Sequence, residues 1–408
     1  MQYAQQIMGE VRKAVVGKDR VLLWSLATIL ARGHILLEDI PGVGKTTLAL
    51  AFSRALGLTY GRVQFTPDVL PSDVTGYSVY NKETGAMTYQ PGAVLCNLFL
   101  ADELNRATSR TQSALLEAME EGQVTVDGQT HPIPQPFTVI ATQNPVGAAG
   151  TQLLPDSQMD RFTIRLSMGY PSPKDERDMI LRRQEGNPLL QIRPVLSLGQ
   201  LTELQDQAAG VYIQAELVDY VVRLAGATRS HPAILRGASP RATLSVTAMA
   251  KSIAFLNGRD YVIPSDIQTV FCETVAHRLL LEPSAEARGR TARDILEEIL
   301  KLKGVRKAYY QSKLAGIYEQ MGEYQTAIEL CERAMREEAE YLRPYITLAE
   351  LYLDSLRDGK KAAKTFKSAQ SFLKKTDSLY EEYVNDMTKI SAFRGKWKEA
   401  RSYADEAI

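Results

Sequence analysis

Cysteine is scarce in this chain. Only three cysteines occur among 408 residues, and Cys96, Cys272 and Cys331 lie far apart. Their number and spacing exclude a disulfide framework and a paired set of metal ligands. We therefore expect buried thiols in a reducing compartment.

The chain also lacks an excess of charge of either sign and a long hydrophobic run. Its 48 basic and 48 acidic residues cancel, which argues against a nucleic-acid coat or a membrane-surface protein. The longest apolar stretch, Val21 to Ala31, is about half the length of a membrane-spanning helix. The first 20 residues carry charges throughout and have no apolar core of a secretory signal. These absences predict a cytoplasmic protein with no membrane span.

The amino-acid composition is typical of a globular protein, and the chain length indicates several domains. Hydrophobic residues are 45 % and charged residues 24 %, and a length of 408 residues favours two or three domains. Residues 1–172 alternate helical patterns with short apolar runs, which predicts an α/β fold with a parallel sheet. Residues 173–285 predict a smaller all-α domain, residues 286–304 a linker, and residues 305–408 a separate helical unit. The predicted strands are His34–Glu38, Val63–Phe65, Leu98–Ala101, Phe137–Thr142 and Phe162–Leu166.

The last 104 residues have their own composition and repeat themselves. They hold 10 of the 19 tyrosines and one of the 18 prolines. The pattern of Leu314–Ala327 recurs in Leu348–Ala363 and, in part, in Gly395–Ala400, at spacings of 34 to 37 residues. It resembles the tetratricopeptide repeat, in which alanines let two helices approach closely. An ordinary helical bundle packed through alanine and tyrosine is the alternative.

The strongest motif is a strand followed by a glycine-rich turn and a helix. Its residues are Asp39-Ile-Pro-Gly-Val-Gly-Lys-Thr-Thr47, so backbone N–H groups and a helix N-terminus converge on one point. This geometry suits a polyphosphate. We expect Lys45 to reach the β- and γ-phosphates of ATP and Thr46 to place its hydroxyl on Mg²⁺. Asp39 stands where the motif usually has its first glycine. The predicted nucleotide-binding residues are Pro41, Gly42, Val43, Gly44, Lys45, Thr46 and Thr47.

Two further predicted strands end in polar side chains. Asp102 and Glu103 follow one of them, and Asn144 follows the next. The carboxyl ends of parallel strands form the ligand crevice of such a sheet. Asp102 is therefore a candidate ligand of Mg²⁺ through a water molecule, and Glu103 a candidate base that polarises the attacking water. Asn144 is a candidate for orienting that water.

The order and the sequences of several motifs resemble those of the MoxR family of AAA+ ATPases over roughly residues 1–285. The similar segments are Leu36–Thr46, Gln64–Gly76, Ala101–Ala107, Gln112–Glu121 and Ala141–Pro145. The resemblance implies that Arg161 is an arginine finger for a neighbouring subunit's γ-phosphate. It also implies that Arg241 is the sensor-2 arginine of a helical lid. Arg106 lies near the site without an assigned role.

The resemblance further implies a Mg²⁺-dependent ATP hydrolase that forms a ring, expected to be a hexamer, and remodels or activates a client protein. An arginine supplied by a neighbour is worth about 10³–10⁵ in rate, so a monomer should be nearly idle. Two hairpins, at residues 76–90 and 123–129, are the expected mechanical outputs. A protein with a von Willebrand factor A domain is an expected client. The repeat tail is expected to recruit partners by binding a peptide or helix.

Two alternatives stay open at this stage. A magnesium-chelatase-like or DNA-acting AAA+ motor would share the core, although the balanced charge makes a nucleic-acid partner unlikely. A nucleotide-switched scaffold with little hydrolysis would share the nucleotide site. Such a scaffold has little need of Glu103 and Arg161.

Overall fold

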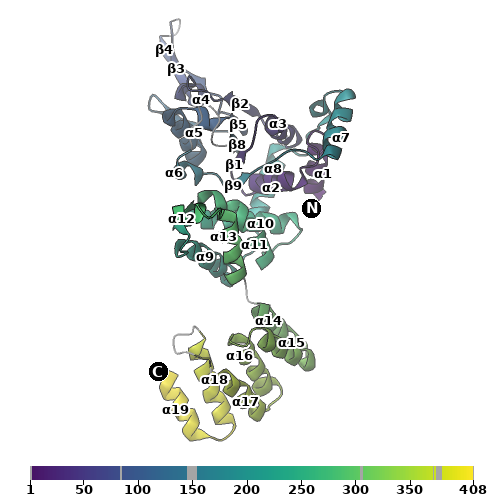
Figure 1. Cartoon of the computed structure of the whole chain (residues 1–408), viewed down its shortest axis with the longest axis vertical. Helices are drawn as coiled ribbons and strands as arrows, with labels where there is room; N and C mark the ends of the chain where they lie inside the picture. Colours follow the sequence, from purple (N-terminus) through teal and green to yellow (C-terminus); the bar gives the residue numbers. More distant parts are fainter. Residues whose placement is uncertain are drawn as a thin grey trace. The chain divides into compact units, whose positions relative to one another are not determined.

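The chain folds into two compact units, residues 1–303 and residues 304–408, each with its own hydrophobic core (Figure 1). The structure is a computed structural model that describes residues 2–82, 85–144, 154–303, 307–370, 372–373 and 379–407. Within these ranges no helix is both long enough and apolar enough to cross a lipid bilayer.

The first unit is built on a parallel sheet of five strands in the order β2-β5-β8-β1-β9. The strands are β1 (Ile35–Glu38), β2 (Tyr60–Gln64), β5 (Leu98–Asp102), β8 (Thr138–Gln143) and β9 (Ile164–Leu166). The predicted parallel sheet is thus confirmed. The second strand begins at Tyr60 rather than at Val63, because it is an edge strand whose Arg62 and Gln64 interrupt the apolar run.

Helices and two hairpins surround this sheet. One face packs on α4 and α5 through a buried cluster that includes Phe99, Leu115 and Met119. Each of the two predicted hairpins is an antiparallel pair of strands. In the hairpin at residues 76–91, Glu83 and Thr84 lie outside the described residues. The helices are α1 (Gln2–Val11), α2 (Asp19–Leu30), α3 (Lys45–Ala55), α4 (Pro71–Thr75), α5 (Ser109–Glu121) and α6 (Asp156–Met159), with a 3-10 turn η1 (Leu104–Arg106). The hairpins are β3 (Gly76–Asn81) with β4 (Ala86–Pro91) and β6 (Gln123–Val126) with β7 (Gln129–Pro132).

Residues 173–303 are mainly helical. A short antiparallel pair, β10 (Ile234–Arg236) with β11 (Leu280–Leu281), is added to the predicted helices. The structure departs from the linker expected over residues 286–304, since α13 buries Ile295, Leu296 and Ile299 and packs on α9 and α11. The helices are α7 (Pro173–Gln184), α8 (Leu198–Ala209), α9 (Ala215–Arg229), α10 (Pro240–Leu256), α11 (Pro264–Val275), α12 (Pro283–Glu286) and α13 (Ala292–Lys303), with 3-10 turns η2 (Pro188–Gln191) and η3 (Ala276–Arg278).

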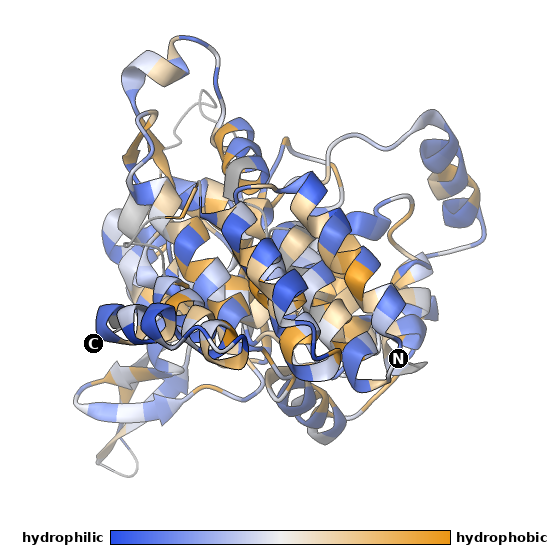
Figure 2. Cartoon of the chain, turned by 90° about the horizontal axis from the view of Figure 1, so that it is seen from below, coloured by the Kyte–Doolittle hydropathy of each residue, from blue (hydrophilic) through white to orange (hydrophobic). Residues whose placement is uncertain are grey.

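The second unit is a series of paired helices. Ala315, Ala327, Ala349 and Ala362 are fully buried, so helices meet at their small residues, as the repeat pattern predicts. The helices are banded with hydrophobic and hydrophilic residues (Figure 2). The tetratricopeptide assignment itself stays a prediction. The elements are α14 (Lys307–Gln320), α15 (Tyr324–Glu337), α16 (Arg343–Glu350), a π-helical turn η4 (Leu351–Ser355), α17 (Gly359–Ala369), α18 (Tyr380–Phe393) and α19 (Trp397–Ala407).

Candidate nucleotide site

The glycine-rich turn forms an open loop between β1 and α3. Gly42 and Gly44 have φ angles of 85° and 98°, a left-handed conformation that glycine adopts without strain. Gly44 is the N-cap of α3 and has no side chain to cap the helix, which begins at Lys45. The first N–H groups of α3 are therefore available to an anion at the positive end of the helix dipole.

Lys45 reaches back from α3 into this loop. Its Nζ donates hydrogen bonds to the backbone oxygens of Asp39 at 2.6 Å and Ile40 at 3.3 Å. Burial lowers the pKa of Lys45, while the negative charges of Asp39, Asp102 and Glu103 act in the opposite direction. The lysine thus faces the acidic pair that ends β5, and a positively charged ammonium lies where phosphates would be held.

Asp102 lies at the carboxyl end of β5 with both carboxylate oxygens engaged. Its Oδ1 accepts a hydrogen bond from the Thr142 hydroxyl at 2.7 Å, and its Oδ2 pairs with Arg62 at 2.9 Å. The Thr142 hydroxyl oxygen also accepts the backbone N–H of Glu103 at 2.8 Å. One hydroxyl on β8 therefore fixes the positions of both acidic residues.

Glu103 lies between two polar side chains. Arg106 donates to its Oε2 at 2.7 Å, and Asn144 Nδ2 donates to its Oε1 at 3.1 Å. The Arg106 guanidinium, and to a lesser degree Asn144, lowers the pKa of Glu103 against the opposing effect of burial. Glu103 is therefore an ionised carboxylate at neutral pH, which is the form that can accept a proton from water.

Asn144 is held by its backbone and keeps an unused acceptor. Its backbone N–H and C=O bind the side chain of Asn105 at 3.4 Å and 3.2 Å. Its own Oδ1 is buried and has no hydrogen-bond partner among the described residues. Pro145, the next residue of the predicted motif, lies outside the described residues. A buried acceptor beside a base is able to receive a hydrogen bond from a water molecule.

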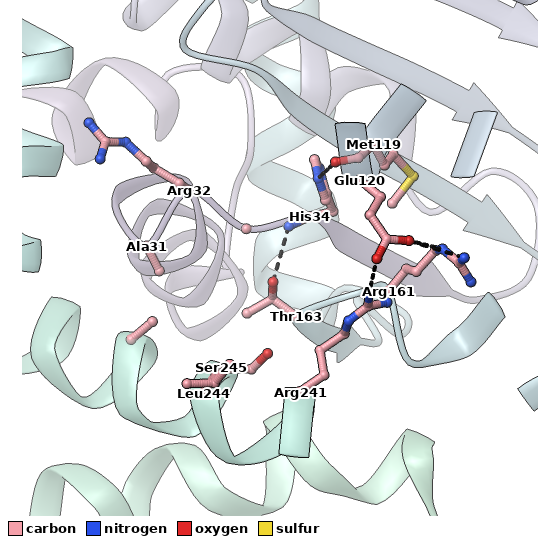
Figure 3. Close-up of a pocket in the computed structure, with 12 residues that line it drawn as sticks. Ala31, Arg32, His34, Met119, Glu120, Arg161, Thr163, Arg241, Leu244 and Ser245 are labelled. Atoms are coloured by element: carbon pink, nitrogen blue, oxygen red, sulfur yellow. Dashed lines mark hydrogen bonds and ion pairs between the residues drawn. The ribbon is translucent and has the colours of Figure 1, made fainter. Parts of the chain in front are cut away.

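Arg161 and Arg241 lie together, away from the phosphate loop. Both pair with Glu120 of α5, Arg161 at 3.1 Å, and both line a pocket of about 290 Å³ (Figure 3). Gly33 and His34, which precede β1, line the same pocket, whereas the phosphate loop follows β1. A strand of four residues is about 13 Å long. The two arginines therefore lie at the amino edge of the sheet and the phosphate loop at its carboxyl edge.

The position of Arg161 is fixed by the residue before it. The Asp160 carboxylate accepts a hydrogen bond from Ser239 at 2.9 Å and pairs with Arg278 at 3.3 Å. Burial lowers the pKa of Arg278 to about 10, and the nearby carboxylate of Asp160 opposes this shift. Asp160, which follows α6 and precedes Arg161, is thus joined to Ser239, the N-cap of helix α10, whose second residue is Arg241.

The structure brings together Lys45, Asp102, Glu103 and Asn144 at one edge of the sheet, and Arg161 with Arg241 at the other. Sequence reasoning missed Arg62, Asn105 and Glu120. Glu120 lies in the segment Gln112–Glu121 that carries the family resemblance. The sequence therefore indicates the motif but not that Glu120 pairs with Arg161 and Arg241. Arg62 comes from an edge strand and gives no motif of its own.

Comparisons with known proteins agree with this arrangement. Residues 34–164 match the family model "ATPase family associated with various cellular activities (AAA)", and residues 226–299 match an AAA lid domain. A crystal structure of a candidate ATPase from Cytophaga hutchinsonii superposes with a TM-score of 0.68 at 38% identity, covering 74% of this chain and 94% of that one. The fold is thus that of an AAA ATPase, with a parallel-sheet core and a helical lid.

Two relatives narrow the assignment. Chaperone MoxR1 of Mycobacterium tuberculosis is 42% identical over 300 residues, which are 71% of this chain and 79% of the relative. Uncharacterized protein YeaC of Bacillus subtilis is 45% identical over 290 residues, which are 71% of this chain and 91% of the relative. The chain belongs to the MoxR family of AAA ATPases.

Proposed function

We propose that this chain is a Mg²⁺-dependent ATP hydrolase that works as a ring and acts on client proteins. The observation that carries this proposal is the meeting of Lys45, Asp102, Glu103 and Asn144 at the carboxyl ends of adjacent strands. A cation, a metal-binding carboxylate, a base and a water-orienting amide are the parts that hydrolysis of a phosphoanhydride requires.

The residues at the loop fit a nucleotide and its metal ion. Open space lies where a side chain of residue 42 would stand, so a ligand can approach the backbone there. Thr46 and Asp102 would hold Mg²⁺, Asp102 through a water molecule. When bound, the metal ion neutralises charge on the phosphate oxygens. Lys45 can exchange its backbone carbonyl partners for phosphate oxygens.

Glu103 is proposed as the base and Asn144 as the residue that orients water. The ionised Glu103 carboxylate accepts the proton of the water, and the buried Oδ1 of Asn144 receives that water's second hydrogen bond. Each Glu103 carboxylate oxygen accepts one hydrogen bond, from Arg106 or from Asn144, and has a second lone pair for water.

The separation of the arginines from the phosphate loop supports action between subunits. Arg161 and Arg241 share Glu120 at the amino edge of the sheet, opposite the edge at which the phosphate loop of their own chain lies. They act, in this proposal, on nucleotide held by a neighbouring copy, Arg161 as the arginine finger and Arg241 as the sensor-2 arginine of the lid. A closed ring gives every site such a neighbour, and six subunits is the number that the family resemblance implies.

The two hairpins are the proposed contacts with client protein. Tyr80 and Met87 on β3 and β4 are 59% and 62% exposed, which is unusual for large apolar side chains. Tyr89 stacks on His131 of β7 with ring centroids 3.6 Å apart, so the two hairpins are joined. A protein with a von Willebrand factor A domain is one proposed client. The tail, as a tetratricopeptide-like repeat, would recruit partners by binding a peptide or helix.

Turnover measured in mixtures of two variants tests this function. Glu103→Gln removes the base and Arg161→Ala removes the finger, so each alone should lose at least about 100-fold in ATP turnover. A mixed ring contains interfaces with an intact Glu103 on one side and an intact Arg161 on the other. Activity should therefore return when the variants are mixed, and wild-type activity per subunit should rise with protein concentration.

The matched control is Glu117→Gln, an exposed residue one turn earlier on α5 than Glu120. It should turn over ATP as the wild type does. Nucleotide binding without turnover in the wild type would favour the switched scaffold. Failure of the mixed variants to regain activity, with each variant still binding ATP, would contradict catalysis across an interface.

A further inference from the structure

Asp39 occupies a position where phosphate loops usually have glycine. It directly follows β1, the strand that precedes the loop, and its side chain is buried with 7% of the residue exposed. A buried carboxylate so close to a site for polyphosphate is unfavourable unless it is fully hydrogen-bonded. Its partners therefore indicate what it does there.

The Asp39 carboxylate binds the chain segment that follows β9. It accepts hydrogen bonds from the backbone N–H of Met168, from the backbone N–H of Gly169 at 3.2 Å and from the Ser167 hydroxyl at 3.1 Å. These three donors are consecutive residues. A glycine at position 39 would offer none of them an acceptor.

The register of the sheet explains this contact. Leu37 of β1 pairs with Leu166 of β9. Asp39 and Met168 come two residues later in each segment, so they would be partners if the same register continued. The backbone of the loop turns away after Asp39, and its own N–H still binds Gln143 on the opposite strand β8. The Asp39 side chain thus continues the pairing of β1 with β9 beyond the point where backbone pairing ends.

The same segment contacts the loop and the start of the lid. The methyl group of Met168 lies 3.8 Å from the position that a Cβ at Gly44 would occupy. Lys18 donates to the backbone oxygens of Gly169 at 3.2 Å and Tyr170 at 2.8 Å, which fixes the segment from its other side. Helix α7 begins three residues later, at Pro173.

We propose that Asp39 is a positioning residue that holds the segment Ser167–Gly169 against the phosphate loop and thereby sets the affinity for the nucleotide polyphosphate. This inference rests on the proposed function only in requiring that the loop binds a nucleotide. The carboxylate fixes the first residue of the loop, so the N–H groups that follow stay converged before the phosphates arrive. A preorganised loop loses less conformational freedom on binding, which strengthens binding.

Two contributions weaken the loop when Asp39 is replaced by glycine. The N–H groups of Met168 and Gly169 lose their acceptor, and the new glycine lets the first loop residue sample more backbone conformations. The proposed base Glu103 and the proposed orienting residue Asn144 directly follow β5 and β8 and should keep their contacts. Binding should therefore suffer far more than the turnover of bound nucleotide.

The test is the variant Asp39→Gly, which restores the usual glycine of the motif. The dissociation constant of a fluorescent ATP analogue and the KM for ATP should each rise about tenfold, because the N–H groups of Met168 and Gly169 lose their acceptor. The kcat should stay within about threefold of the wild type. Asp39→Asn retains one acceptor oxygen and should fall between the two. Asp260→Gly, at an exposed lid loop, is the matched control and should bind as the wild type does.

Melting temperatures keep the result interpretable if Asp39→Gly is less stable. A purely structural role would lower the melting temperature equally with and without nucleotide, whereas a positioning role reduces the increase that the analogue produces. Unchanged affinity in Asp39→Gly would overturn the inference, and so would a loss confined to kcat. A wild type that binds the analogue but never hydrolyses ATP would overturn the proposed hydrolase and leave this comparison of affinities standing. A wild type that binds no analogue would overturn both.

Discussion

His34 directly precedes β1, and both nitrogens of its imidazole ring have backbone partners. Nδ1 accepts the N–H of Val139 at 3.0 Å, and Nε2 lies 3.3 Å from the oxygen of Met119, to which it donates. A proton added at Nδ1 would face a donor. Burial accordingly lowers the pKa of His34 to about 4, against the smaller opposite effect of the Met119 carbonyl.

The protein should therefore lose stability as the pH falls below 6.5. The unfolded chain binds a proton on this histidine below pH 6.5, whereas the folded chain does so only near pH 4, so acid favours unfolding in that window. The loss from this residue should reach about 1–2 kcal/mol between pH 7 and pH 5. Urea unfolding of wild type and His34→Gln at the two pH values measures it. An equally steep pH dependence in the variant would contradict the assignment.

The Glu120 carboxylate pairs with both Arg161 and Arg241 in the single subunit. If the two arginines act on a neighbour's nucleotide, as proposed above, they must first leave Glu120. The pairs are partly exposed, so each is worth about 0–1 kcal/mol. Glu120→Gln should lower the protein concentration for half-maximal ATP turnover by up to about fivefold. Glu117→Gln is the control, and reduced activity in Glu120→Gln would indicate that Glu120 aligns the arginines in the assembled state.

Residue identity predicted the loop and the two strand ends well, because each depends on neighbours in sequence. Gly44 with Lys45, and Asp102 with Glu103, carry their chemistry within one short segment. The contacts of Asp39, Arg62 and Glu120 join strands and helices far apart in the chain. No local pattern specifies such partners, so they became visible only in the folded chain.

The hairpin formed by β3 and β4 depends on one close approach of backbone. A Cβ at Gly92, just after β4, would lie 2.2 Å from the backbone oxygen of Val74 and 2.3 Å from the N–H nitrogen of Gly76. These atoms belong to the junction of α4 with β3 and cannot rotate away as a side chain could. Glycine is thus the only residue type that fits at position 92, at the base of this hairpin.

Gly92→Ala should therefore destabilise the protein. We expect a decrease of about 1–3 kcal/mol in the free energy of unfolding, as for other substitutions that overpack a filled space. Gly9→Ala is the control, because nothing lies within 4 Å of its Cβ position and it is inside α1. That change should be neutral or stabilise by about 0.5–1 kcal/mol. Equal melting temperatures for Gly92→Ala and wild type would show that the hairpin base can shift.

At the level of elements, apolar runs located all five strands of the sheet, since buried parallel strands are nearly continuous in apolar residues. Polar residues of the edge strand β2 shortened its predicted length. The charges of residues 286–304 favour a linker that runs into a helix near Ile295, whereas α13 begins at Ala292 and buries Ile295 and Ile299 on one apolar face. The pairing of β10 with β11 joins residues more than 40 apart and has no local signal.

At the scale of the whole molecule, the residues of the candidate nucleotide site and the two arginines all come from the first unit. They lie within residues 39–241, and α13 ends this unit at residue 303. The matched segment of YeaC is 91% of that protein's length but 71% of this chain. A relative of this kind therefore has almost no residues left to correspond to the second unit.

Removal of residues 304–408 should leave the ATPase intact. The shortened chain should bind ATP and turn it over within about twofold of the full chain, because every residue of the candidate site lies in residues 1–303, which form a compact unit of their own. The measurement is turnover against concentration for both chains, with Glu103→Gln in the shortened chain as the inactive control. A shortened chain that is inactive yet folded and able to bind ATP would mean that the second unit takes part in assembling the ring. Partner recruitment, in contrast, should be lost on removal of the tail, so activity and recruitment should separate.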